Sequence, residues 1–261
     1  MIDLKFHKCH CIGNSFIILN DNYINLTSSQ IKKSCQDNLT DGLIIIDSKE
    51  NIPKINYFNN DGSWETFCLN GLACVAMLFE NIYNINVKNI ECNKIIYPVK
   101  INNCNEVIVT VPEPVYIKKN IIVENYKGNY IDSGAKHFVI NFKKQWMDKK
   151  QIKKLSQKIR FNAELFPEGI NVNYYKEISD NTIEVKTYEK GIESLMDSCA
   201  SGSYACAYEY SIKKNINNQI NVLNDGGNFS IMFNENYNKN TVKVKSHLEY
   251  SGVLKINEGN R

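Results

Sequence analysis

Two short motifs, each opened by a cysteine, carry the residues best suited to chemistry in this sequence. One reads Cys-Leu-Asn-Gly at Cys68–Gly71 and the other reads Cys-Ala-Ser-Gly at Cys199–Gly202. A thiolate accepts a proton and a thiol donates one, so two cysteines can act as a base and an acid. If the two cysteines face one carbon from opposite sides, one can remove its proton and the other can add one, which inverts the configuration of that carbon. The motifs therefore predict racemisation or epimerisation at the Cα of an amino acid.

Each cysteine is followed by residues that favour a helix. The alanine-rich stretches Ala73–Phe79 and Tyr204–Tyr208 predict that both cysteines lie at or just before a helix N-terminus. The N–H groups and the dipole at such a terminus stabilise a thiolate. They can also bind a substrate carboxylate, on which charge develops when the α-proton leaves.

The elements around the two motifs predict that the chain consists of two similar halves. Matched pairs are the turn-to-strand segments Gly13–Ile18 and Gly134–Ile140, the helices Gln30–Asn38 and Lys149–Phe161, the apolar runs Leu43–Ile46 and Ile170–Tyr174, and the strands Lys54–Phe58 and Thr182–Tyr188. The second member follows the first by 127 residues at Gly42 and Gly169, and by 131 residues at the cysteines. An offset this constant indicates an internal repeat.

Short strands and few helices make up the expected fold. Further strands are predicted at Glu106–Val111, Gln219–Leu223, Phe229–Phe233 and Thr241–Lys245. This mixture is typical of an α+β or mixed α/β protein. With 261 residues the chain suits two modest domains, and Pro112–Pro114 marks the crossing between them. We therefore expect one half over 1–114 and the other over 115–249.

Composition excludes several classes of partner. The formal net charge is +3 and the 31 basic residues are scattered, which argues against a nucleic-acid partner. No apolar run of about 18 residues predicts a membrane span, and Met1–Phe6 does not begin a signal peptide. We expect a cytoplasmic protein with reduced cysteines. The nine cysteines include no Cys-x-x-Cys pair, so neither a disulfide framework nor a zinc ribbon is indicated.

A metal site is the main rival use of the thiols. His7, Cys9, His10 and Cys11 are close in sequence and could be ligands. No second ligand pair follows at the spacing typical of zinc sites, so we predict no bound metal. Most buried cysteines only pack, and we assign that role to six others: Cys9, Cys35, Cys74, Cys92, Cys104 and Cys206.

Six stretches, taken in order, resemble the diaminopimelate epimerase family over nearly the whole chain. They are Lys8–Phe16, Phe58–Ser63, Cys68–Cys74, Phe166–Asn173, Tyr188–Gly191 and Cys199–Gly202. The resemblance implies two pseudo-symmetric domains, each a barrel-like sheet around a central helix, with the C-terminal strand at 250–261 returning to the first. It implies an active site in the cleft between them and Cys68 and Cys199 as its acid–base pair. It also implies that neither pyridoxal phosphate nor a metal is needed and that a homodimer can form.

The resemblance assigns the amino-acid head of the substrate to residues that are intact here. Asn14 and Glu189 are expected to bind the α-ammonium group. Backbone amides are expected to hold the α-carboxylate at Leu69, Asn70, Ala200 and Ser201. One extra residue separates Glu189 from Cys199 relative to the family pattern.

The distal end of the substrate site departs from the family. Asn59 and Asn171 remain, but Ala135 replaces an asparagine and Lys190 replaces an arginine. Leaving a buried polar group unpaired costs about 1–3 kcal/mol, and lysine cannot form the two-pronged contact of arginine. We therefore predict a substrate with one amino-acid head. Histidine racemases among relatives of the family fit, with Asn59 and Asn171 bonding the imidazole.

Several alternatives stay open. The nearest is an epimerase of diaminopimelate itself or of its thioether analogue lanthionine. Proline or hydroxyproline racemases also use two cysteines, although their motif spacing fits this chain less well. Isomerases of the phenazine-biosynthesis type share the fold but lack the cysteine pair. A non-enzymatic binding protein is disfavoured by the intact Cys68, Cys199, Asn14 and Glu189.

Overall fold

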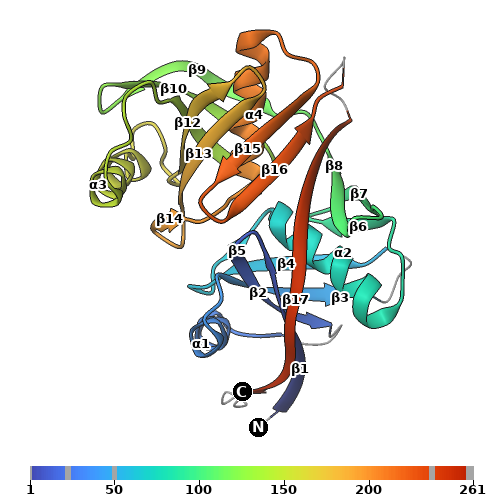
Figure 1. Ribbon diagram of the computed structural model, residues 1–261. Coiled ribbons are helices and arrows are strands. Elements are labelled where there is room, and N and C mark those ends of the chain that lie inside the picture. Colours follow the sequence, from blue (N-terminus) through green and yellow to red (C-terminus); the bar gives the residue numbers. More distant parts are fainter. Residues whose placement is uncertain (1, 21–24, 49–51, 235–238, 257–261) are drawn as a thin grey trace. The chain divides into compact units, whose positions relative to one another are not determined.

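The computed structural model of the protein describes residues 2–20, 25–48, 52–234 and 239–256. The chain divides into two compact units (Figure 1). Unit 1 consists of Met1–Val109 and Val244–Arg261, and unit 2 consists of Thr110–Lys243. No helix within the described residues is long and apolar enough to cross a membrane.

Unit 1 alternates strands with two helices. Its elements, in order, are β1 (Ile2–Cys11), β2 (Asn14–Asn20), α1 (Ser28–Asn38), β3 (Gly42–Asp47), β4 (Lys54–Asn59), β5 (Trp64–Glu65), α2 (Leu69–Tyr83), β6 (Asn89–Cys92), β7 (Ile95–Ile101) and β8 (Glu106–Val111), which reaches the unit boundary.

Unit 2 repeats this order. Its elements are β9 (Val115–Val123), β10 (Tyr126–Asp132), β11 (Lys136–Asn141), α3 (Lys149–Arg160), β12 (Asn171–Ser179), β13 (Thr182–Glu189), β14 (Ser194–Met196), α4 (Ala200–Lys214), β15 (Gln219–Asn224), β16 (Gly227–Met232) and the start of β17 (Asn240–Ile256).

Strand pairing confirms the internal repeat. In unit 1, β2 pairs in parallel with β3, β3 is antiparallel to β4, and β4 pairs in parallel with β6. In unit 2 the corresponding strands β11, β12, β13 and β15 show the same sequence of parallel and antiparallel pairs. The short strands β5 and β14 each extend a hairpin from β4 and β13. A mixed sheet with few helices is therefore the fold of each half.

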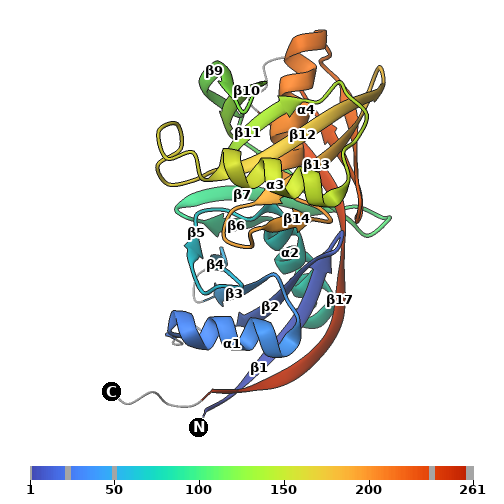
Figure 2. The same ribbon diagram turned by 90° about the vertical axis from the view of Figure 1, so that its left-hand side faces the viewer.

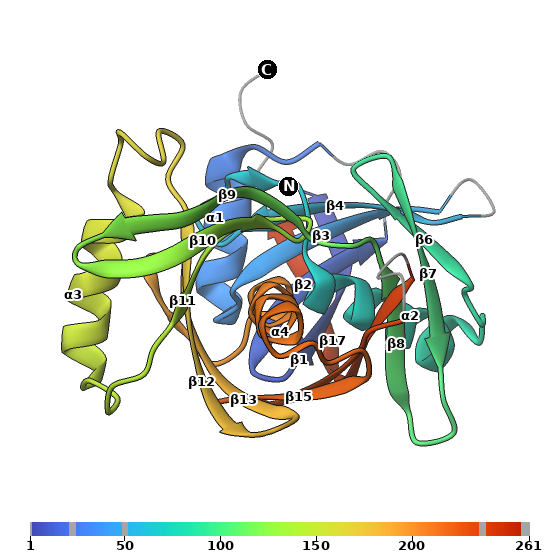
Figure 3. The ribbon, with the colours of Figure 1, turned by 90° about the horizontal axis from the view of Figure 1, so that it is seen from above.

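The second helix of each unit is its centre. Residues Leu69–Phe79 of α2 are all buried, as are Ala200–Tyr208 of α4. A helix that is apolar or small on every face must be enclosed. Seen from above, α4 lies inside the curved sheet formed by strands such as β11, β12 and β13 (Figure 3). This confirms the barrel-like sheet around a central helix.

The first helix of each unit covers the outside of its sheet. Both α1 and α3 begin with a capping box, in which the side chain of Thr27 or Asp148 pairs with a glutamine three residues later. Each then buries one narrow apolar stripe, through Ile31 in α1 and through Ile152 and Ile159 in α3. These helices and the cores beneath them fix the strands that lead to the two cysteine motifs.

The last strand differs from the sequence expectation. Two separate segments were expected, Thr241–Lys245 and a return over 250–261, but β17 is one strand over Asn240–Ile256. Its start pairs with β16 and the remainder runs antiparallel to β1, beside which it lies in Figures 1 and 2. A register shift at Lys8/Cys9 keeps the two strands paired along their length. Residues 257–261 lie outside the described part of the chain.

Candidate active site

Cys68 is the N-cap residue of α2, as the sequence predicted. Its backbone is extended, with φ −141° and ψ 104°, and its Sγ accepts the Gly71 N–H at 3.4 Å. The residue is half-buried. The thiol thus lies among the first N–H groups of a helix, where a thiolate is stabilised. The backbone of Leu69 and Asn70, which we expected to hold a carboxylate, belongs to the same first turn.

A hydrogen-bonded chain of side chains ties Asn14 to this helix start. Asn14 follows a tight turn between β1 and β2 in which Ile12 and Gly13 both have positive φ. Its Oδ1 accepts a hydrogen bond from Asn70 Nδ2 at 3.2 Å, and its Nδ2 donates to Asp41 Oδ2 at 3.2 Å. Both ends of the Asn14 amide are therefore fixed, and the residue sits 5% exposed beside the Cys68 motif.

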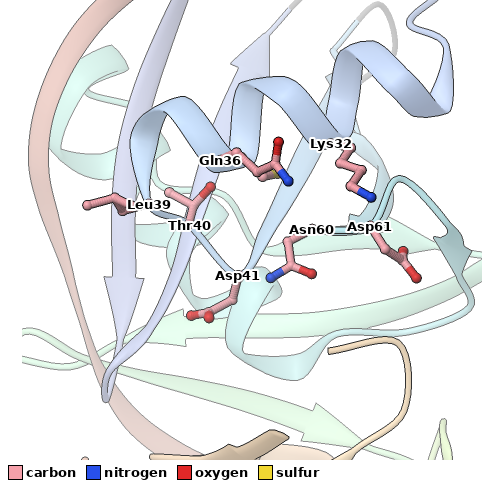
Figure 4. Close-up of a pocket in the computed structure, with 8 residues that line it drawn as sticks. Lys32, Gln36, Leu39, Thr40, Asp41, Asn60 and Asp61 are labelled. Atoms are coloured by element: carbon pink, nitrogen blue, oxygen red, sulfur yellow. The ribbon is translucent and has the colours of Figure 1, made fainter. Parts of the chain in front are cut away.

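Asp41 anchors that chain at the edge of a surface pocket. Its Oδ2 also accepts the N–H and hydroxyl of Ser15 at 2.8 and 3.1 Å. The pocket, of about 400 Å³, is lined by Lys32, Cys35, Gln36, Leu39, Thr40, Asp41, Asn60 and Asp61 (Figure 4). It lies on the α1 side of Asp41 and includes no residue of the Cys68 motif.

Asn59, predicted to bind the substrate, is held by its own neighbours. It is 2% exposed, accepts the Tyr57 hydroxyl at 2.9 Å and donates to Ser63 Oγ at 3.2 Å. Ser63 is itself held by Asp61. Each end of the Asn59 amide thus has one protein partner, which orients the amide and halves what it can offer a ligand.

Cys199 occupies the same position in unit 2. It is the N-cap residue of α4, with φ −146° and ψ 110°, and is 8% exposed. Burial, and after it the Glu189 carboxylate, raise its pKa to about 12, although hydrogen bonds from the Ser201 hydroxyl and from the N–H groups of Gly202 and Ser201 act to lower it. The helix start was expected to favour the thiolate, but here desolvation of the charge outweighs it. Cys199 is therefore a neutral thiol at neutral pH.

A buried polar network connects Cys199 to the sheet. The Ser201 Oγ lies 3.5 Å from Cys199 Sγ and 3.1 Å from His137 Nε2, and His137 Nδ1 lies 2.7 Å from Asn173 Oδ1. Asn173 Nδ2 in turn donates to Thr187 Oγ1 at 2.7 Å. A neutral imidazole donates at one nitrogen and accepts at the other, so it bridges both neighbours.

Sequence reasoning missed this network, although its parts were visible. His137 and Asn173 both stand in motifs that were noted, and β11 pairs in parallel with β12 at His137↔Asn171. That register places Asn173 on the same sheet face as His137. The glycine of the Cys199 motif is explained by the same packing, since a Cβ on Gly202 would lie 2.2 Å from Asn173 Nδ2.

Asn171 ties together the ends of three strands. Its Nδ2 donates to the Lys136 carbonyl at 3.0 Å and its Oδ1 accepts the Lys190 N–H at 2.9 Å. The amide that sequence reasoning assigned to the substrate therefore positions the backbone of both lysines. Lys136 Nζ forms an exposed ion pair with Glu168 at 3.0 Å, and Lys190 also lowers the pKa of Glu168. Asp132 also acts electrostatically on Lys136, so this group contains more than one carboxylate.

The histidine- and cysteine-rich start of the chain forms ordinary packing contacts. Cys9 and Cys11 are buried, His7 bonds Ser251 at 2.7 Å, and His10 stacks on His247 with ring centroids 5.1 Å apart. Of the cysteines expected to pack, those at 9, 35, 74, 92 and 206 are buried, which confirms the prediction. Cys104 is exposed instead, because it lies in the turn between β7 and β8.

Comparison with known proteins gives the fold and site a family. The chain is 31% identical over 279 residues to the diaminopimelate epimerase of Aquifex aeolicus, an alignment that covers 98% of this chain and 97% of that protein. This chain belongs to the diaminopimelate epimerase family. The diaminopimelate epimerase family profile matches residues 129–247, and the diaminopimelate epimerase of Hydrogenobaculum is 27% identical over 82% of this chain and 86% of that protein.

Several solved structures have a fold similar to that of this diaminopimelate epimerase family member at low sequence identity. A probable proline racemase from Agrobacterium radiobacter matches with a TM-score of 0.74 at 10% identity, over 97% of this chain and 93% of that chain. A hydroxyproline epimerase from Agrobacterium vitis gives 0.73 at 10% identity, over 97% and 92%. A phenazine biosynthesis protein from Enterococcus faecalis gives 0.69 at 10% identity, over 98% and 100%.

Family membership settles the class of enzyme. An epimerase or racemase inverts a stereocentre without changing the composition of its substrate, so this family member is an isomerase. The structure places Cys68, Asn14, Asn70 and Asn59 within unit 1, and Cys199, Ser201, Glu189, Lys190 and Asn171 within unit 2. Each unit thus carries one cysteine with its own set of polar neighbours.

Proposed function

We propose that the chain inverts the Cα of an amino acid without a cofactor, by proton transfer between Cys68 and Cys199. The observation that carries this proposal is the equivalence of the two cysteines. Each is the N-cap of the buried central helix in units whose strands pair in the same order. Two bases on opposite faces of one carbon are what stereochemical inversion requires, and a duplicated half supplies one base from each copy.

The different environments of the two thiols assign their resting states. Cys68 is half-buried and accepts the Gly71 N–H, which favours it as the base, whereas buried Cys199, whose pKa is raised, is favoured as the acid. The Cys68 thiolate removes the Cα proton, and the electron pair of the C–H bond delocalises toward the carboxylate. Cys199 then delivers its proton to the opposite face and becomes a thiolate. Nothing is oxidised or reduced, and the reverse reaction uses the same groups in exchanged roles.

The substrate head is bound by helix starts and by one carboxylate. N–H groups at Leu69 and Asn70, and at Ala200 and Ser201, hold the carboxylate and stabilise the charge that develops on it. Asn14 and Glu189 bind the α-ammonium group. Glu189 already acts on Cys199 electrostatically, which supports its place near the reacting carbon.

Diaminopimelate is the substrate that the observations favour. The relative from Aquifex aeolicus that matches over nearly the whole chain is a diaminopimelate epimerase. The Lys190 N–H donates to Asn171, so a cationic side chain follows the Asn171 amide in space and suits an anionic distal group. Histidine is the second candidate, favoured by Ala135 and by the loss of an arginine at Lys190. Because Asn59 and Asn171 are occupied by protein partners, they support an imidazole less than the sequence suggested.

Proton NMR in D₂O discriminates these substrates directly. Purified protein with reductant is incubated with LL-diaminopimelate, lanthionine, L-histidine or L-proline, and loss of the Cα–H signal is followed. Exchange mainly of diaminopimelate supports the first candidate, and exchange mainly of histidine replaces it with the second. Absence of exchange with every amino acid tested contradicts the proposal of a two-cysteine racemase.

Lys190→Arg sharpens the choice of substrate. An arginine restores a two-pronged donor for a distal carboxylate, so kcat/KM for diaminopimelate is expected to rise by about fivefold or more, equivalent to about 1 kcal/mol. Exchange of histidine is expected to stay within twofold. The matched control is Lys213→Arg at the end of α4, far along the helix from Cys199. An equal effect of Lys190→Arg on both substrates would mean that residue 190 does not bind a distal carboxylate.

The order of alkylation tests the resting states of the thiols. With limiting iodoacetamide at pH 7.5, Cys68 is expected to be modified before Cys199, because Cys199 is buried and its pKa is raised to about 12. Peptide mass spectrometry at timed intervals measures both sites in one sample. Cys104, which is exposed, serves as the internal reference. Faster labelling of Cys199 than of Cys68 would reverse the assigned roles.

A further inference from the structure

The β13–β14 hairpin carries Glu189 at its tip and leads directly to Cys199. Glu189 is the last residue of β13 and pairs with Ser194, the first residue of β14. The turn between them is closed by the Glu193 N–H, which donates to the Glu189 carbonyl at 2.9 Å. Only Asp197 and Ser198 separate β14 from Cys199. The position of this turn therefore sets where Glu189 lies.

The Glu193 carboxylate accepts hydrogen bonds from two other residues of the hairpin. Its Oε1 accepts the Gly191 N–H at 3.1 Å, and its Oε2 accepts the Tyr188 hydroxyl at 3.1 Å. Glu193 itself adopts φ 55°, a left-handed conformation that is unusual for a residue with a side chain. A strained backbone persists where surrounding contacts over-determine it. These contacts hold the turn from inside the hairpin.

Arg160 holds the same carboxylate from outside the hairpin. It is the last residue of α3, and its Nε and Nη2 donate to Glu193 Oε1 at 3.1 and 2.9 Å. The Arg160 side chain is 12% exposed, whereas the Lys158 side chain, which pairs with Glu124 from the same helix turn, is 56% exposed. A contact in which two guanidinium nitrogens donate to one carboxylate fixes geometry as well as charge.

The sequence makes room for this arginine at one position. A Cβ on Gly169 would lie 1.2 Å from Arg160 Nη1, and Gly169 has φ 70°. The glycine thus lets the guanidinium cross from α3 to the turn. Arg160 is also the one arginine within the described residues, in a chain whose other basic residues there are lysines.

We propose that Arg160 is a positioning residue of the catalytic centre: its ion pair with Glu193 holds the 190–193 turn so that Glu189 faces the ammonium group of the substrate. This inference rests on the proposed function, in which Glu189 binds that group. The Arg160–Glu193 ion pair, here called the clasp, thus joins the end of α3 to the turn that follows Glu189.

The test compares Arg160→Met with Lys158→Met. Both remove a cation from the last turn of α3, but Lys158 pairs with Glu124, outside the hairpin. In Arg160→Met we expect KM for the amino acid that exchanges in D₂O to rise about tenfold with kcat less affected, since a misplaced binding group weakens binding of the ammonium. In Lys158→Met both constants are expected to stay within twofold. Arg160→Lys, which keeps the charge and loses the fork, is expected to be intermediate.

Alkylation of Cys199 supplies a readout that needs no turnover. If the turn loosens, Glu189 moves away from Cys199 and the pKa of the thiol falls. The rate of Cys199 alkylation at pH 9 then rises about threefold for each unit of that fall, allowing for the lower nucleophilicity of the thiolate. Glu189→Gln, which removes the charge without moving the turn, gives the upper limit. A simple loss of stability, read from the thermal midpoint, does not produce this pattern.

The variant Glu193→Gln distinguishes loss of the Arg160–Glu193 ion pair from a general loss of stability. If one ion pair acts, the double variant Arg160→Met/Glu193→Gln is no worse in KM than the more severe single variant. Additive effects, or equal behaviour of Arg160→Met and Lys158→Met, would overturn the inference. If Glu189→Gln leaves KM unchanged while Arg160→Met still speeds alkylation of Cys199, the binding role of Glu189 is wrong and the clasp on the hairpin stands.

Discussion

Replacing either Cys68 or Cys199 by serine is expected to lower the rate of Cα inversion by about 10³- to 10⁴-fold. A serine hydroxyl keeps the size and hydrogen bonds of the thiol but is a much weaker acid, so no alkoxide base is available near neutral pH. Loss of either partner stops inversion, because each direction needs one base and one acid. Chiral chromatography of the most active amino acid measures the remaining rate of inversion.

Two other cysteines provide matched controls for these variants. Cys74 and Cys206 lie on the same two helices as the proposed pair and are fully buried. Cys74→Ala and Cys206→Ala are expected to lose stability through the small cavity that each creates but to keep exchange within threefold at a temperature where they are folded. A Cys68→Ser or Cys199→Ser variant that retains a tenth of the wild-type rate of inversion would refute the two-cysteine mechanism.

Local sequence patterns predicted the elements well where propensity and burial agree. The helices expected from Gln30 and Lys149 begin at Ser28 and Lys149, and both cysteines are N-caps as predicted. These features depend on residues within one or two turns. The repeat was also visible, because both halves need the same glycine, helix and apolar strand in the same order.

Long-range register could not be predicted from the same patterns. The continuity of β17 depends on its pairing with β1, more than 200 residues earlier in the chain, which no local signal encodes. The parallel pairing of β11 with β12 is of the same kind, and it alone brings His137 to Asn173. No local pattern in the sequence indicates that Arg160 reaches Glu193.

Two asparagines assigned to the substrate have protein partners that the sequence did not predict. Asn59 bonds Tyr57 and Ser63, and Asn171 bonds the backbone of Lys136 and Lys190. An asparagine offers the same groups to a ligand and to a neighbouring backbone, so sequence alone cannot separate the two.

His137 links the Cys199 network to stability in mildly acidic solution. Burial lowers its pKa to about 4 from a value of 6.5, and the imidazole has no exposed surface. Between these values the unfolded chain binds a proton that the folded chain does not. The free energy of unfolding is thus unaffected by this group above pH 6.5 and falls as the pH is lowered toward 4. His7 and His10, whose pKa values burial also lowers, act in the same direction.

The expected loss from His137 is about 3 kcal/mol between pH 6.5 and 4, from a difference of about 2.5 pKa units at 1.36 kcal/mol each. His137→Gln keeps a neutral polar side chain and cannot be protonated, so its unfolding free energy is expected to depend less on pH by that amount. Urea denaturation at several pH values measures both proteins, and the contributions of His7 and His10 cancel in the comparison. Parallel pH profiles for the two proteins would mean that His137 is protonated in the folded state, and the Ser201–His137–Asn173 chain would then need an imidazolium that donates at both nitrogens.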